Sequence, residues 1–88
     1  MDSDVIAKQL LRSATSVAAN YRAAQRSRSK AEFISKISVV VEEADETVFW
    51  LELLTESGLV SAERIGDLTR EANELLAIFA ASQRTARN

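Results

Sequence analysis

The sequence predicts an all-α protein, an antiparallel up-down bundle with three long helices per chain. Three observations lead to this fold class. The 88 residues contain no proline and only two glycines, a composition that suits uninterrupted helices better than turn-rich sheets. Apolar residues recur at steps of three and four along most of the chain. Serine and glycine signals that begin and end helices separate the apolar stretches into three, within one domain of residues 1–88.

The first helix is expected over residues 4–25. Its apolar stripe consists of Ile6, Leu10, Ala14, Val17, Tyr21 and Ala24. Several polar residues interrupt the helix, and serine and threonine among them can bond back to carbonyls one turn earlier. Asn20 is expected at a helix–helix contact with its side-chain amide satisfied across that contact. We therefore expect a structural role for Asn20 rather than ligand binding.

The second helix is expected over residues 30–57, after a capping box at Ser29. In this motif the Ser29 hydroxyl accepts a hydrogen bond from the amide of Glu32, and the Glu32 carboxylate accepts one from the amide of Ser29. Gly58 is expected to end the helix because glycine readily adopts the left-handed conformation of a C-cap. The core-facing stripe consists of Phe33, Ile37, Val40, Ala44, Val48, Leu51 and Leu54.

The third helix is expected over residues 62–86, with Ser61 as its N-cap and Glu63 in its first turn. Arg84 and Arg87 lie in its last turn, where cations interact favourably with the helix dipole. The apolar stripe has a rhythm close to a heptad repeat and consists of Ile65, Leu68, Ala72, Leu75, Phe79 and Ser82.

The second helix carries more apolar residues than one core-facing stripe can hold. Val39, Phe49, Trp50 and Leu53 lie outside the stripe, on a side that they share with glutamates. Long side chains of the other helices could cover them, or they could form a contact surface between copies. We favour an oligomer interface, because clustered exposed aromatic residues mark contact surfaces and a domain of this size buries only roughly 60–65% of its unfolded surface.

The charges divide unevenly along the chain. Residues 1–36 carry seven cations against three acids, and residues 37–88 carry four cations against ten acids. This asymmetry indicates either a basic surface at one end of the molecule or helices of opposite charge that neutralise each other. The first interpretation makes four residues around the first helix corner candidates for contacts with RNA phosphates: Arg22, Arg26, Arg28 and Lys30.

Composition argues against enzymatic and metal chemistry. The chain has no histidine and no cysteine, and no glycine-rich phosphate loop is present. The carboxylates of residues 42–46 splay around a helix, so most of them form a solvated face. We expect no catalytic residues, no cofactor and no metal site. The longest apolar run, residues 75–81, is too short to cross a bilayer, and the acidic, polar start is unlike a secretory signal, so we expect a cytoplasmic protein.

Three segments carry a family resemblance: LLRSATSVAANYRAA (10–24), SRSKAEFISKISVVVEEADETVFWLELL (27–54) and LTREANELLAIFAAS (68–82). They resemble the bacterial four-helix bundle proteins first noticed as reading frames within intervening sequences of large-subunit ribosomal RNA genes. The resemblance implies an antiparallel helix bundle that assembles as a homopentamer. It also implies relatives that serve as accessory subunits of diversity-generating retroelements, where a basic pentamer binds a reverse transcriptase and its RNA.

The chain departs from the family pattern in two ways. Family members usually carry another helix before the one that begins here, and Ala23 stands where a glutamate is common. A neighbouring subunit could fill the stripe that the other helix would cover. We therefore expect a non-enzymatic, homo-oligomeric scaffold or interaction protein. The alternative is an RNA-binding accessory protein that uses the basic corner, although relatives with that role are strongly basic and this chain has a net charge of -2.

Overall fold

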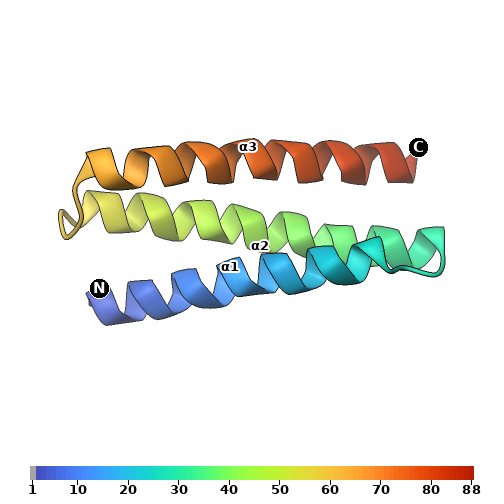
Figure 1. The fold of residues 1–88 in the computed structure, drawn as a ribbon, viewed down its shortest axis with the longest axis horizontal. Helices are drawn as coiled ribbons and strands as arrows, with labels where there is room; N and C mark the ends of the chain where they lie inside the picture. Colours follow the sequence, from blue (N-terminus) through green and yellow to red (C-terminus); the bar gives the residue numbers. More distant parts are fainter. Residues whose placement is uncertain (1) are drawn as a thin grey trace.

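The computed structural model describes residues 2–88 and confirms the all-α fold class. The three helices are α1 (Ser3–Gln25), α2 (Lys30–Glu56) and α3 (Ala62–Arg87). These bounds differ from the expected ones by at most one residue at each end. The helices run antiparallel in an up-down order, and α2 lies in the middle (Figure 1). The described chain forms an elongated body of 44 × 20 × 16 Å.

Each of the three helices has a short polar side chain at its N-cap. This side chain accepts a hydrogen bond from a backbone amide that has no partner within the helix. The Asp2 carboxylate accepts from Asp4 N at 2.8 Å, Ser29 Oγ from Glu32 N at 3.0 Å, and Ser61 Oγ from Arg64 N at 3.4 Å. One of the two hydrogen bonds of the expected capping box has a different donor. Glu32 Oε2 accepts from the amide of Arg28 at 3.3 Å rather than from that of Ser29, so the carboxylate fixes the chain one residue earlier.

Gly58 makes the turn that separates α2 from α3. Its φ is +75°, in the left-handed region where a Cβ collides with the following carbonyl. Its amide donates to Thr55 O at 3.1 Å, so the turn satisfies one of the last carbonyls of α2. The chain then reverses, and α3 runs back along α2 for its whole length (Figure 1).

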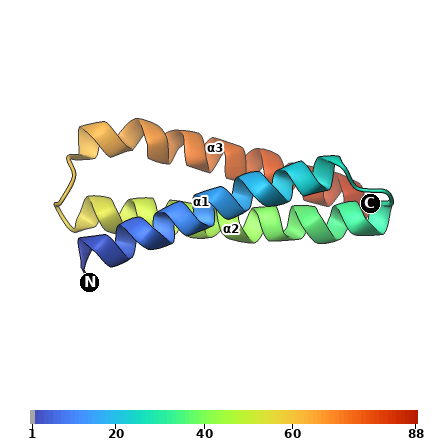
Figure 2. The same cartoon turned by 60° about the horizontal axis from the view of Figure 1, so that its bottom comes forward.

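The core lies along α2, because the backbones of α1 and α3 each approach α2 and not each other. No Cα atom of α1 lies within 8 Å of one in α3 over residues 2–88. Figure 2 shows α1 crossing over α2, with α3 diverging from α1 at the end of the bundle where α1 begins. Within the described chain, the buried apolar side chains are those of Ile6, Ala24, Ile37, Val40, Ala44, Val48, Leu51, Ile65 and Phe79.

Burial follows the expected stripe on α2 but only part of the expected stripes on α1 and α3. On α1, Ala14 is exposed and Tyr21 is 40% exposed. On α3, Leu68 and Leu75 are 54% and 48% exposed. These side chains lie along the space between α1 and α3, which no further helix of the described chain fills. The apolar stripes predicted from the sequence therefore contain more apolar surface than the three helices bury.

The two glycines allow a matched test of this fold. A Cβ atom added at either position would meet nothing within 4 Å, so backbone conformation alone distinguishes them. Gly58→Ala should lower the free energy of unfolding by about 1–2 kcal/mol, because alanine at positive φ is strained. Gly66→Ala, within α3, should raise it by about 0.5–1 kcal/mol through higher helix propensity. Urea unfolding followed by circular dichroism at one protein concentration measures both, and changes of the same sign would contradict the assigned turn.

Candidate functional site

A charged network joins α1 to α2 beside the only tryptophan of the chain. Arg12 Nη1 lies 3.1 Å from Glu43 Oε2, and Arg12 Nη2 pairs with Glu46 Oε1. The same Glu46 oxygen accepts a hydrogen bond from Trp50 Nε1 at 3.1 Å. The indole N–H and then the Arg12 guanidinium lower the pKa of Glu46, because both stabilise its ionised form. The hydrogen bond to Glu46 in turn raises the pKa of Arg12. The network holds the indole against the helix surface.

The tryptophan belongs to an apolar ridge along the outer face of α2, formed by Val39, Phe49, Trp50 and Leu53. Phe49 is 51% exposed, and the other three side chains are half-buried. The rings of Phe49 and Trp50 meet edge to face, with centroids 4.9 Å apart and planes at 72°. Long side chains of α1 and α3 leave Phe49 uncovered. The four residues predicted as an oligomer interface share the face of α2 turned away from the core with Glu42 and Glu46, and we call this face the α2 ridge.

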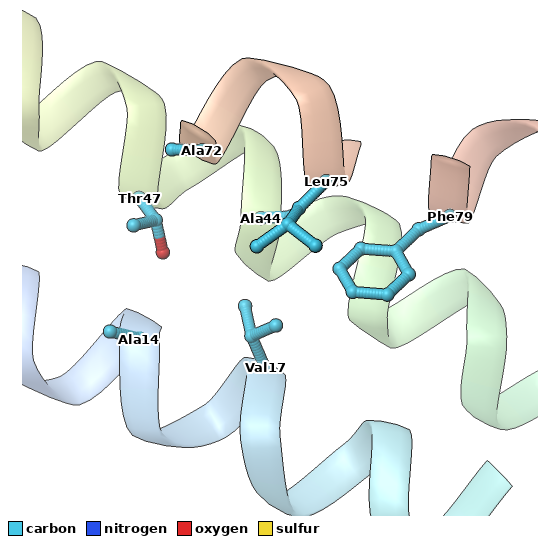
Figure 3. A pocket seen from close by; sticks show the side chains of 7 residues that line it. All are labelled: Ala14, Val17, Ala44, Thr47, Ala72, Leu75 and Phe79. Carbon is cyan, nitrogen blue, oxygen red and sulfur yellow. The ribbon is translucent and has the colours of Figure 1, made fainter. Parts of the chain in front are cut away.

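A second apolar surface is the groove between α1 and α3, with α2 as its floor. Two adjoining hollows of about 160 and 300 Å³ share four lining residues and so form one groove. Figure 3 shows Leu75 and Phe79 reaching from α3 towards Val17 on α1. One end is closed by Tyr21 and Phe79, whose ring centroids lie 5.2 Å apart. Together the hollows are lined by Leu10, Ala14, Val17, Ala44, Thr47, Leu51, Leu68, Glu71, Ala72, Leu75 and Phe79.

Exposed large apolar side chains gather along the edges of this α1–α3 groove. On α3, Leu68 and Leu75 line it, and Ile78 follows Leu75 by three residues and is 58% exposed. On α1, Leu11 precedes the groove residue Ala14 by three residues and is 66% exposed. Residues three apart on a helix are neighbours on its surface, so these side chains extend the apolar lining outwards.

The polar groups near the groove floor are satisfied within the protein. Ser13 is buried and donates to Leu10 O at 3.1 Å. Thr47 Oγ1 lies 3.0 Å from Ser13 Oγ and 2.8 Å from Glu43 O. This hydroxyl contact between α1 and α2 was not predicted from the sequence, because a serine in an otherwise apolar helix gives no sign of its partner. The floor offers a ligand apolar contacts rather than free hydrogen-bonding groups.

Asn20 differs from expectation, because its amide is not satisfied across a helix–helix contact. Asn20 Nδ2 donates to Ser16 O at 2.9 Å and to Ser16 Oγ at 3.2 Å, both one turn earlier on α1. Polar side chains often bond back to their own helix in this way. The half-buried side chain therefore has a local structural role.

The third surface is a basic end, where the antiparallel course of the chain gathers cations from all three helices. Arg22 lies in the last turn of α1, Arg26 and Arg28 in the following connection, and Lys30 at the start of α2. The last turn of α3, with Arg84 and Arg87, reaches the same end (Figure 1). The ion pairs found in residues 2–88 involve Arg12 and Arg70, and none neutralises this end.

The sequence pattern relates Arg84 and Arg87 only to the helix dipole. Their place beside the corner follows from the up-down topology, so helix order combined with charge could have identified them. Arg87 Nη2 and Gln83 Nε2 donate to Ser38 Oγ at 3.3 and 3.0 Å, which anchors the end of α3 to α2. We define the basic end by six cations in or beside these helix ends: Arg22, Arg26, Arg28, Lys30, Arg84 and Arg87.

The carboxylates of the described chain do not gather into a metal centre. Residues 2–88 contain no group of three or more acidic, histidine or cysteine side chains arranged to hold a metal ion. No helix in this part of the chain is both long enough and apolar enough to cross a bilayer.

Comparison with known proteins identifies a matching family model and similar solved structures. Residues 2–81 match the model of the 23S rRNA-intervening sequence protein family. The fold is similar to the crystal structure of a protein of unknown function from the S23 ribosomal protein family of Bacteroides thetaiotaomicron VPI-5482. That match has a TM-score of 0.85 and 35% sequence identity, and it covers 90% of this chain and 73% of the other. No curated protein matches.

Proposed function

Because this chain belongs to the 23S rRNA-intervening sequence protein family, we propose that it is a non-enzymatic interaction protein that assembles from several copies of itself. The family resemblance noted for the sequence favours a pentamer. The assembly serves as a helical scaffold, and its surfaces, rather than a catalytic centre, perform its function.

One observation supports this proposal above all: apolar surface remains exposed on two sides of a thin bundle. Phe49 of the α2 ridge is 51% exposed, and Leu11 and Ile78 beside the α1–α3 groove are 66% and 58% exposed. Contiguous apolar patches on a small domain mark contact surfaces. Burial of these side chains between copies adds the hydrophobic stabilisation that a chain of this length has difficulty obtaining alone.

Light scattering after size-exclusion chromatography tests self-assembly. The wild-type protein should have a mass several times the 9.7 kDa of one chain. Trp50→Ala should weaken assembly by about 2 kcal/mol, or roughly thirtyfold in the dissociation constant, because a large aromatic contact is lost. Leu53→Ala should act in the same direction. Leu59→Ala is the control, since Leu59 is 57% exposed but lies outside both apolar surfaces. A folded wild-type monomer at every concentration would refute the proposal.

RNA binding is a second candidate, favoured by the convergence of Arg84 and Arg87 with the four cations of the corner. Guanidinium groups pair readily with phosphates. Repetition of the basic end around an assembly adds avidity without new contacts. The overall charge of -2 does not oppose this, because the acids lie mostly on other parts of the chain.

Binding of a labelled single-stranded RNA at two salt concentrations tests this candidate. If the six cations contact phosphates, affinity should fall by roughly a hundredfold to a thousandfold between about 50 and 200 mM salt. The pair Arg26→Ala and Arg28→Ala should weaken binding and flatten the salt dependence, and so should Arg84→Ala with Arg87→Ala. The pair Arg64→Ala and Arg70→Ala removes the same charge from the opposite half of α3 and should have little effect. Absence of binding at low salt would exclude this function.

A further inference from the structure

We propose that Arg12 and Glu46 are positioning residues for Trp50, and that α1 in this way sets the shape of the α2 ridge. This role rests on the proposed self-assembly, in which the α2 ridge contacts a second copy. It gives α1 a part in that contact, although the four apolar residues of the ridge all lie on α2. The tryptophan of the ridge is then ordered before a second copy arrives.

The Arg12 guanidinium is held by acceptors from two helices. On α1, Gln9 Oε1 accepts a hydrogen bond from Arg12 Nε at 3.1 Å. On α2, Glu43 Oε2 accepts from Arg12 Nη1 at 3.1 Å, and Glu46 Oε1 pairs with Arg12 Nη2. All three guanidinium nitrogens therefore have partners. Because the guanidinium is planar and rigid, these partners fix its orientation, and it in turn fixes the Glu46 carboxylate.

The Glu46 carboxylate transmits this order to the indole. Glu46 and Trp50 are four residues apart on α2, so they are neighbours on its surface. The oxygen that pairs with Arg12 also accepts from Trp50 Nε1 at 3.1 Å. The same indole meets the Phe49 ring edge to face, with centroids 4.9 Å apart. A tryptophan side chain has two rotatable bonds, so a hydrogen bond and a ring contact together select one orientation.

Two costs of association fall when the indole is ordered in this way. Association immobilises side chains that move in the free protein, and a rotamer that is already selected avoids that loss of entropy. Burial of an indole N–H without an acceptor is also costly, and Glu46 supplies the acceptor within the same chain. A second copy therefore needs only apolar contacts to cover Trp50.

Time-resolved fluorescence anisotropy tests the positioning, because Trp50 is the only tryptophan of the chain. In protein diluted until light scattering shows single chains, the wild-type indole should rotate with the whole bundle. Glu46→Ala should increase the amplitude of fast, independent indole motion by about twofold or more. Arg12→Met should act in the same direction. Glu46→Gln should restore part of the order, because its amide oxygen can still accept from the indole.

Light scattering over a dilution series measures the effect on assembly. Glu46→Ala should raise the dissociation constant between copies about threefold to tenfold more in the wild type than in a Trp50→Phe background, which lacks the indole N–H. The charge of Glu46 is lost in both backgrounds, so the comparison isolates its contact with the indole.

Arg70→Met is the matched control for both measurements. It breaks an ion pair of the same kind, with Asp67 on α3 at 3.1 Å, and should change neither the indole motion nor the dissociation constant. Circular dichroism checks that every variant is helical, which is expected because exposed ion pairs contribute little to stability.

The outcomes separate the positioning role from the proposed self-assembly. Unchanged indole motion in Glu46→Ala, or an equal loss of assembly in the Trp50→Phe background, overturns the positioning role while self-assembly stands. A wild type that stays monomeric refutes the proposed self-assembly, and the anisotropy comparison then decides alone whether Arg12 and Glu46 order the indole.

Discussion

The structure depends on the packing of two helices against a third that is apolar on more than one side. α2 buries a single stripe against α1 and α3, and it exposes Phe49 on its outer face. Because the backbones of α1 and α3 stay apart within residues 2–88, apolar side chains on both helices, such as Leu11 and Leu75, remain exposed. Three helices of this length can enclose one line of side chains, and the surplus apolar surface has to be covered by something else. The self-assembly that we propose would cover this surface.

Charge plays two separate roles in the molecule. Near the middle, Arg12 on α1 pairs with Glu43 and Glu46 on α2, as expected for helices of opposite charge packed together. At the basic end, cations from all three helices gather without carboxylate partners in residues 2–88. Both interpretations of the charge asymmetry therefore apply, each to a different part of the bundle. The opposite charges near the middle join α1 to α2, and the cations of the basic end leave a surface available to polyanions.

Most of the fold could be predicted from sequence, because local signals determine helix ends and periodicity determines the α2 stripe. Ser29, Gly58 and Ser61 each act through their own backbone neighbourhood. The candidate surfaces were harder to predict from the sequence. Periodicity showed that α1 and α3 have apolar stripes but not that part of each stripe faces an unfilled groove. The contacts of Arg12 and Ser13 with α2 depend on the register between helices, which no local pattern encodes. Similarly, the hydrogen-bond partner of the Asn20 amide depends on the rotamer of that side chain.

The fluorescence of Trp50 tests most directly whether the surplus apolar surface is covered by other copies. It is the only tryptophan of the chain, and it lies on the ridge beside Phe49. If copies cover the ridge, emission should occur at short wavelength in concentrated protein and move to longer wavelength over about a thousandfold dilution, as mass action returns the indole to water. An emission typical of a water-exposed indole in concentrated, fully helical protein, unchanged by dilution, would contradict this explanation of the structure.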